Sequence, residues 1–456
     1  MKGEIVMAWY DKAVIYHIYP LGLCGCRHEN SGVAENHFEK LNKWAEHAKK
    51  IGCTCIYIGP LFESGSHGYD TINYRKVDKR LGNNKDFRNF ISNCHKIGLK
   101  VIVDGVFNHV GRNFFAFEDL KKNRENSKYR NWFCNVNFLG NNEYNDRLCY
   151  ENWGGDNLLV KLNNNNEEVV KYHLDTVKFW IDEFDIDGIR LDVAEVLDFN
   201  FMKRLRIFTE NLKNDFWLMG EVIHGDYSRW ANSEMLHSVT NYSMYKSIYS
   251  SHNDHNYFEL AHNIKRMIEM TGKLRLYTFV DNHDVSRIYS ILKNKEHIYN
   301  TLLLQYTIPG IPSIYYGSEF CIEGNKNQGD DWNLRPCLDL NNYKDYYYKN
   351  KITNLLCKLG ELKANYLELT YGDYKELKLT NRQFAFARIL ENHAVVTIVN
   401  NDYKSITMEI DMPFEVSNAV DILDTTKNNN LLKIDTKRKK LIIDIPSNSG
   451  GLLYIK

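Results

Sequence analysis

Short apolar runs alternate with longer amphipathic stretches from residue 13 to about residue 320. The apolar runs are typical of buried strands, and the longer stretches repeat apolar residues with the period of a helix. The expected strands are Val14–Tyr19, Cys55–Ile58, Lys100–Val106, Ile186–Leu191, Phe216–Met219, a weaker one at His237–Asn241, Leu276–Val280 and Ser313–Tyr316. Helical patterns between them include His37–Lys50, Asp86–Lys96, Asn166–Glu183 and Asn200–Leu212. Eight alternations of strand and helix predict an α/β fold in which a parallel sheet closes into a (β/α)₈ TIM barrel.

One connection of this barrel is unusually long. After the strand that ends near Phe107, the next clear helix begins near Asn164. A structureless loop of that length is improbable in a compact domain. We therefore expect residues 108–163 to form an inserted subdomain on the C-terminal face of a barrel built from residues 1–107 and 164–364.

The pattern changes after about residue 365. Five β-rich runs follow, separated by turns rich in Asn, Lys and Gly: Phe384–Ile389, Ala394–Val399, Ser405–Ile410, Lys440–Ile445 and Gly451–Ile455. Such spacing is typical of an antiparallel sandwich. Residues 365–456 are predicted to form a C-terminal all-β sandwich domain.

Charge and hydropathy exclude several partners. Lys plus Arg and Asp plus Glu number 58 each, so no global field favours nucleic acid or an anionic membrane. No apolar stretch approaches the roughly 20 residues needed to cross a bilayer. The N-terminal residues 1–12 contain no continuous apolar segment of the kind found in secretory signals. With ten scattered cysteines that fit no zinc pattern, we expect free thiols and a cytoplasmic location.

Polar residues cluster where four of the predicted strands end. They lie in Val101–His109, Asp187–Asp192, Leu218–Glu221 and Phe279–Asp284. Polar groups at the C-terminal ends of barrel strands converge on one site. Carboxyl groups crowded at one barrel mouth repel each other, so a structural role explains them poorly.

Glycosidic cleavage needs this set of groups, because one carboxylate acts as nucleophile and one carboxylic acid protonates the leaving oxygen. Arg190 lies two residues before Asp192, on the same strand face, where its charge lowers the pKa of that carboxyl and keeps it ionised. Glu221 follows an apolar strand, so desolvation can raise its pKa and suit it to the acid role. Asp284 can hold sugar hydroxyls, to which His109 and His283 can donate hydrogen bonds.

These segments resemble the conserved regions of the α-amylase superfamily, glycoside hydrolase family 13. Further matches are Tyr16–Pro20 with the first strand of that family, His67–Asp70 with Tyr74 and Val77–Asp78 with its second-strand loop, and Gly310–Gly317 with its eighth strand. The resemblance covers nearly the whole chain. It is greatest with neopullulanases, cyclomaltodextrinases and maltogenic amylases. Because the first predicted strand begins at residue 14, we expect the chain to lack their N-terminal β-domain.

The resemblance implies a role for each matching residue. Asp192 matches the nucleophile, Glu221 the general acid/base and Asp284 the transition-state stabiliser. Asp104, Arg190, His109 and His283 match the supporting shell, and Tyr69 matches the aromatic residue that stacks under the sugar at the cleavage point. Asp70 and Arg335 match a pair that helps to close the non-reducing end in exo-acting members; the alternative is a simple salt bridge between loops.

Calcium is the one metal that the resemblance raises. Asn108 matches a position that ligates calcium in many α-amylases, and Asp156 is a candidate partner from the inserted subdomain, since calcium prefers such oxygen ligands. The alternative is that Asn108 only forms a hydrogen bond to the loop. The chemistry itself needs no cofactor.

We therefore expect a retaining hydrolase of α-glucosidic, mainly α-1,4, bonds in maltodextrins, cyclodextrins or related α-glucans, present as a monomer or homodimer. Alternatives are a 4-α-glucanotransferase or exo-acting α-glucosidase on the same barrel, and a catalytically inactive carbohydrate-binding scaffold. Substrate preference depends on positions where the chain departs from its nearest relatives, namely Val160, Glu195, Val196 and Ile223.

Overall fold

The computed structural model describes residues 7–327, 329–423, 434–437 and 439–456. Its main sheet has eight parallel strands in the order β11-β10-β9-β5-β2-β1-β13-β12. A parallel bridge between Thr240, just after β11, and Tyr277 of β12 joins the two ends, so the sheet closes into the predicted barrel. Its strands are β1 (Ile15–Ile18), β2 (Cys55–Ile58), β5 (Lys100–Gly105), β9 (Gly188–Leu191), β10 (Trp217–Gly220), β11 (Ser238–Val239), β12 (Tyr277–Phe279) and β13 (Ile311–Tyr315).

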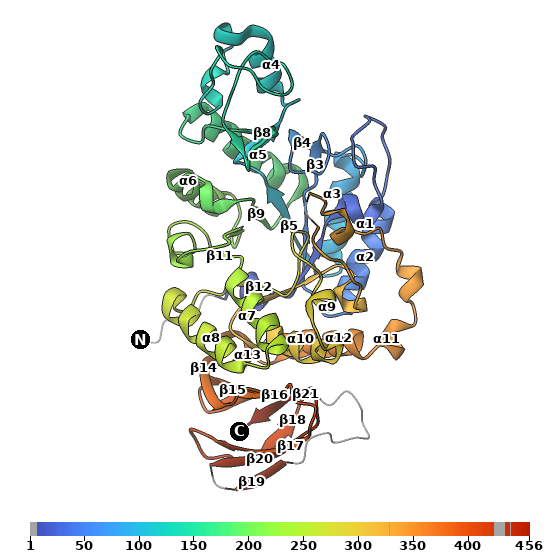
Figure 1. Ribbon diagram of the computed structural model, residues 1–456, viewed down its shortest axis with the longest axis vertical. Helices are drawn as coiled ribbons and strands as arrows, with labels where there is room; N and C mark the ends of the chain where they lie inside the picture. The colour runs from blue at the N-terminus through green and yellow to red at the C-terminus, as the bar shows by residue number, and fades with distance from the viewer. Residues whose placement is uncertain (1–6, 328, 424–433, 438) are drawn as a thin grey trace.

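Helices surround this barrel (Figure 1). Where the sequence predicts a start at Asp86, the helix begins two residues earlier, because Asn83 caps it and Asp86 completes a capping box. Gly98 ends the same helix in a left-handed conformation with a φ of 75°, as predicted. The helices in and around the barrel are α1 (Pro20–Cys24), α2 (Phe38–Lys50), α3 (Asn84–Lys96), α5 (Glu167–Phe184), α6 (Phe199–Leu212), α7 (Tyr242–Asn253), α8 (Tyr257–Thr271), α9 (Ile288–Ile291), α10 (Ile298–Thr307), α11 (Tyr346–Lys349), α12 (Lys351–Asn365) and α13 (Glu368–Tyr371).

Alternate residues of each strand point to opposite sides of the barrel wall. Ile15, Tyr57, Ile102, Met219 and Phe279 belong to one buried cluster that fills the barrel interior. The residues between them, such as Tyr16 and Ile56, belong to the larger core under the helices. Both faces of the wall are therefore buried, which explains why the strands are continuous apolar runs.

Two small sheets lie at the C-terminal ends of the strands. One pairs β3 (Phe62–Ser64) with β4 (Thr71–Val77). The other has the order β6-β8-β7 and is built from β6 (His109–Gly111), β7 (Asn152–Trp153) and β8 (Asp156–Lys161). With α4 (Phe115–Asn123), this second sheet occupies the long connection after β5 and forms the upper end of the molecule in Figure 1.

Antiparallel strands form the opposite end of the molecule (Figure 1). A five-stranded sheet, β14-β15-β16-β21-β18, packs against a three-stranded sheet, β17-β20-β19, with an apolar core between them. Their bounds are β14 (Asp373–Leu379), β15 (Gln383–Leu390), β16 (His393–Asn400), β17 (Ile406–Asp411), β18 (Ala419–Asp421), β19 (Ile434–Lys437), β20 (Lys440–Ile445) and β21 (Ser449–Ile455). The expected β domain is present, although its first strand begins only at residue 373.

The central strands β15 and β16 of the five-stranded sheet are buried on both faces. Phe384, Phe386 and Val399 pack into the barrel core, whereas Ala385, Ala387 and Ile398 face the three-stranded sheet. In contrast, β17 alternates between buried and exposed residues, as expected for a strand with one solvated face. In the described part of the chain, none of the helices has the length and apolar character needed to cross a membrane.

Candidate active site

The polar ends of four barrel strands meet in one pocket. Asp192 follows β9, Glu221 follows β10, and Asp284 lies five residues after β12. All three line a pocket of about 940 Å³, together with Tyr69 and His109. The structure therefore brings the predicted carboxyl groups together, each from a different strand.

A single guanidinium organises two of these carboxyl groups. Arg190, 3% exposed, donates from Nη1 to Asp192 Oδ1 at 2.8 Å and to Asp104 Oδ1 at 2.9 Å. Its Nη2 lies 2.8 Å from Glu221 Oε1. Because both nitrogens belong to one rigid fork, Asp192 and Glu221 are held side by side.

The electrostatics of Asp192 differ from the expectation. Burial raises the pKa of the Asp192 carboxyl well above its usual range, and Glu221, Asp104 and Asp284 add to the effect. Arg190 opposes this shift, as predicted, but one cation does not offset burial among three other acids. The Asp192 carboxyl therefore keeps its proton to a higher pH than an isolated aspartate would.

Glu221 has further partners. Its Oε2 accepts a hydrogen bond from the backbone N–H of Val193 at 3.0 Å, and its Oε1 accepts one from the Tyr242 hydroxyl at 3.4 Å. Val193 has a φ of 42°, which is unusual for a β-branched residue. The left-handed turn after the predicted nucleophile thus aims a backbone donor at the predicted acid.

Asp284 has the opposite electrostatic environment from Asp192. Its Oδ1 accepts from Arg335 at 3.0 Å, and its Oδ2 lies 3.0 Å from Nε2 of His283. Burial alone would raise the pKa of Asp284, but His283 and Arg335 hold it well below its usual range. The group is therefore a fixed negative charge at the pocket.

Among the described residues, Asp70 and Arg335 do not form the salt bridge that was the alternative, and their shared role at the non-reducing end stays a prediction. Arg335 contacts Asp284 and the backbone oxygen of His283 instead. Asp70 accepts from the Ser66 hydroxyl at 3.0 Å and lines a neighbouring pocket that also includes Gly65 and Gly111. The sequence could not show this, because the pairing depends on how the β2–α3 and β13–α11 loops pack.

Below the pocket, Asp104 connects the aromatic residues to Arg190. It accepts hydrogen bonds from Tyr57 at 2.8 Å and from Tyr69 at 3.3 Å. The Tyr69 ring stacks on His283, with ring centroids 5.6 Å apart and an interplanar angle of 15°. Tyr69 therefore has a fixed orientation at the pocket wall, as a platform for a sugar requires.

His109 closes the side formed by the inserted subdomain. Its Nε2 lies 3.9 Å from Asp192 Oδ2 and has no hydrogen-bond partner among the described residues. Burial, with a contribution from His67, lowers the pKa of His109 to about 3, so the imidazole is neutral. Trp153, from β7, lies parallel to this imidazole at 6.4 Å and lines the same pocket.

The calcium ligands suggested by the resemblance do not lie together. Asn108 is buried, and its side-chain nitrogen contacts His109 Nδ1 at 3.2 Å. Its backbone oxygen accepts from the N–H of Leu162, just after β8, whereas Asp156 is the first residue of β8, six residues and about 20 Å along the chain from Leu162. Among the described residues, no group of three or more His, Cys, Asp or Glu side chains could hold a metal ion. These residues do not fit a calcium site, and no step is assigned to one.

Several residues at the pocket were not predicted from the sequence. Tyr242 contacts Glu221, Trp153 forms a wall, and Lys326 donates to the backbone oxygen of Asp284 at 2.8 Å. Tyr242 could have been found, because it directly follows the strand predicted at 237–241. Lys326 lies on a long loop, and Trp153 lies on the short strand β7 of the inserted subdomain, so no barrel strand end indicates their position.

Comparison with known proteins agrees with this geometry. A family model described as α-amylase, catalytic domain, matches residues 39–352, which is more than half of the chain. The chain belongs to the α-amylase family. The predicted family and the predicted class, a glycosidase acting on O-glycosyl bonds, are thereby confirmed.

Relatives and solved structures extend this similarity beyond the barrel. A cyclomaltodextrinase of Thermoanaerobacter pseudethanolicus is 30% identical over 98% of this α-amylase-family chain and 76% of its own length. A maltogenic α-amylase of Bacillus acidopullulyticus is 31% identical over 79% of the chain, which spans only 62% of that relative. A debranching enzyme of Nostoc punctiforme superimposes with a TM-score of 0.81 at 26% identity, covering 98% of both chains.

Proposed function

We propose that the chain hydrolyses α-glucosidic, mainly α-1,4, bonds of maltodextrins and cyclodextrins with retention of configuration. The observation that carries the proposal is the Arg190 fork, which holds Asp192 and Glu221 side by side at one pocket. Retaining glycosidases place their two carboxyl groups roughly 5–5.5 Å apart, so that one can attack while the other protonates. The names of relatives, cyclomaltodextrinase and maltogenic α-amylase, support the substrate class.

In the first step, the Asp192 carboxylate attacks the anomeric carbon while Glu221, as the general acid, passes its proton to the leaving glycosidic oxygen. In the second step, the Glu221 carboxylate takes a proton from water, which attacks the glycosyl-enzyme and releases Asp192. Asp284, kept ionised by His283 and Arg335, accepts hydrogen bonds from sugar hydroxyls and favours the positive charge that develops on the ring. Carboxyl groups supply all of this chemistry, so we propose that no cofactor takes part.

The test is to follow products from maltoheptaose, β-cyclodextrin and pullulan by chromatography. The wild-type protein should shorten at least one of them, and Asp192→Asn should lose roughly 10⁴-fold or more of that activity. Asp175→Asn, at an exposed position on α5, is the matched control and should keep full activity. No product from any glucan, or unchanged activity in Asp192→Asn, would refute the proposal.

The same experiment separates hydrolysis from the alternatives. Transfer by a 4-α-glucanotransferase yields oligomers longer than the substrate, and an exo-acting α-glucosidase releases only glucose. Proton NMR of the first products shows the anomer formed; initial release of the β anomer would contradict retention.

We propose a cytoplasmic location and an α-glucan oligosaccharide as the substrate partner. In support, a relative from Bacillus subtilis, 29% identical over 78% of the chain, is named an intracellular maltogenic amylase. All ten cysteines are free thiols, five of them buried, which suits a reducing compartment. Subunit assembly, as monomer or homodimer, stays a prediction that light scattering would test.

A further inference from the structure

A second pocket adjoins the catalytic pocket next to Glu221. Its volume is about 510 Å³, and it shares Ile223 and Tyr242 with the catalytic pocket. The hydroxyl of Tyr242 contacts Glu221, which is the proposed proton donor to the leaving group. The second pocket therefore lies where a substrate that extends past Glu221 could reach it.

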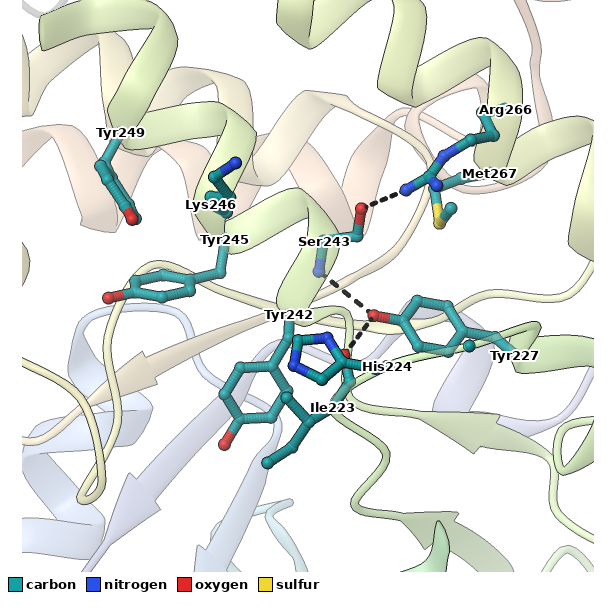
Figure 2. Close-up of a pocket in the computed structure, with 11 residues that line it drawn as sticks. Ile223, His224, Tyr227, Tyr242, Ser243, Tyr245, Lys246, Tyr249, Arg266 and Met267 are labelled. Carbon is teal, nitrogen blue, oxygen red and sulfur yellow. Dashed lines mark hydrogen bonds between the residues drawn. The ribbon is translucent and has the colours of Figure 1, made fainter.

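One side of the second pocket is aromatic. Tyr242, Tyr245 and Tyr249 lie at spacings of three and four along α7, which places them on one helix face (Figure 2). Tyr245 stacks on Phe279 with an interplanar angle of 14°, and this contact fixes its ring. Half-buried tyrosines combine an apolar face with a polar hydroxyl, as the recognition of a sugar requires.

The other groups at this pocket are cationic. Lys246 is exposed, and its ammonium has no hydrogen-bond or ion-pair partner among the described residues. Arg266 donates from Nη2 to Ser243 Oγ at 2.6 Å (Figure 2). The same Nη2 donates to Asn263 Oδ1 at 3.0 Å, while Nε and Nη1 have no such partner in the described part of the chain. None of the described residues that line the pocket is Asp or Glu. Two cations with free donors thus face one cavity without a neutralising carboxylate.

The two adjoining pockets have opposite charge. The catalytic pocket is lined by five acidic residues, Asp192, Glu221, Asp284, Asp330 and Asp331, against two cations, Lys326 and Arg335, so its excess of carboxyl groups disfavours an anionic group. The second pocket attracts such a group, and the planar guanidinium of Arg266 suits the oxygens of a phosphate or carboxylate. This asymmetry would orient a substrate with its anionic end away from the carboxyl groups.

We propose that this pocket binds an anionic substituent, a phosphate or a carboxylate, on the leaving-group end of the α-glucoside substrate. Tyr245 and Tyr249 contact the sugar ring, and Lys246 and Arg266 bind the anion. The assignment of this end as the leaving group rests on the proposed function, whereas the binding of an anionic sugar does not.

Binding is tested first, by calorimetry with glucose 6-phosphate, glucuronic acid and glucose. Glucose 6-phosphate should bind to the wild-type protein, and Lys246→Met and Arg266→Gln should each weaken it roughly tenfold. Lys178→Met, on the exposed face of α5, is the matched control and should bind as the wild type does. Equal binding of glucuronic acid identifies a general anion site, and weaker binding identifies a phosphate site. Binding of glucose as tight as that of glucose 6-phosphate, or unchanged binding in both variants, would overturn the proposal.

Turnover is tested second, with maltotriose and with maltotriose that carries a phosphate on its reducing-end glucose. Lys246→Met should lower kcat/KM roughly tenfold for the phosphorylated substrate and leave neutral maltotriose unchanged. An equal loss for both substrates would mean that Lys246 acts on the fold and not on the anion. If the wild-type protein cleaves neither substrate, the proposed function fails, and the calorimetry still decides whether the anion site exists.

Discussion

Asp192 and Asp284 line the same pocket but have different electrostatic environments. This difference predicts that their substitutions change the stability of the protein in opposite directions. The pKa of Asp192 is raised in the folded state above its unfolded value of about 3.9. At a pH between these two values, the folded protein binds a proton on Asp192 that the unfolded chain has released. Stability is therefore lost as pH rises through this window, and at neutral pH the ionised group is destabilising. Asp192→Asn should raise Tm at pH 7 by a few degrees while it abolishes turnover, as differential scanning calorimetry would show.

Asp284 should show the reverse. Its folded-state pKa is lowered, so it contributes stability that is present above about pH 4 and is lost as pH falls further. Asp284→Asn removes the partner of Arg335 and His283 and should lower Tm at pH 7 by a few degrees. A Tm change of the same sign in the Asp192 and Asp284 variants would contradict the two environments described here.

The raised pKa of Asp192 also sets the pH dependence of catalysis. Because Asp192 must be ionised to attack, kcat/KM should fall on the acid side at a pH above the 3.9 of an ordinary Asp. Asp104→Asn removes a nearby negative charge and frees Arg190 for Asp192, so it should shift this acid limb downward by up to about one pH unit. The pH profile of Asp175→Asn is the reference, and an upward shift in Asp104→Asn would contradict the argument.

At the scale of elements, the glycine after β2 controls the position of Asp104. A Cβ on Gly59 would lie 2.5 Å from Asp104 Oδ2, so Gly59→Ala must displace the carboxylate that Arg190 binds. Displacing a pocket group by about 1 Å can cost roughly 100-fold in rate, so kcat/KM should fall by that order while the fold persists.

Gly65→Ala is a matched control for Gly59→Ala. Its Cβ would lie 2.6 Å from Asp70 Oδ2, a similar clash with a carboxylate that lines a different pocket. The Gly65 variant should keep kcat/KM within a few-fold of the wild type. A large loss there would show that Asp70 acts on the substrate after all, as the resemblance first implied.

Strands and helices could be predicted from the sequence where a local signal exists. Runs such as Lys100–Val106 are apolar on both faces, and Gly98 marks the end of the preceding helix, so both boundaries lie within a few residues of those observed. Strands β14, β18 and β19 were not predicted. For example, β14 carries four charged residues among its seven and resembles an exposed loop until it pairs with β15.

The residues of the catalytic pocket could likewise be predicted only where a local sequence signal exists. Asp192, Glu221 and Asp284 follow strand ends, so barrel geometry alone brings them together. Arg335 and Lys326 lie on the long connection after β13, and their contacts with Asp284 depend on how that connection folds back. Sequence patterns do not encode such a path, so they could not predict that Arg335 contacts Asp284.

At the scale of the whole molecule, the barrel and the C-terminal sandwich share one core. All ten residues of α10 are buried, and the five-stranded sheet packs against the barrel with apolar residues such as Phe384 and Val399. Neither part can expose this face without losing buried apolar area. The two parts should therefore unfold together.

Arg388, which is buried at this interface on β15, provides the test. It donates to the backbone oxygens of Gly372, Thr307 and Leu369 at 2.9–3.2 Å. Arg388→Met leaves these carbonyl groups without a donor, which should lower the free energy of unfolding by about 3 kcal/mol.

Calorimetry measures this effect against Lys375→Met, an exposed control on the neighbouring strand β14. The sandwich lies at the opposite end of the molecule from the inserted subdomain that walls the catalytic pocket (Figure 1). The Arg388 variant should therefore keep the kcat/KM of the wild type at 25 °C while its single unfolding transition moves to lower temperature. Two separate transitions in the wild-type protein would contradict the shared core. Lost activity in a fully folded Arg388 variant would mean that a change at the interface alters the catalytic pocket. Arg388 contacts the end of α10, which precedes β13, and Arg335 lies on the loop after β13. The effect would therefore be transmitted through β13.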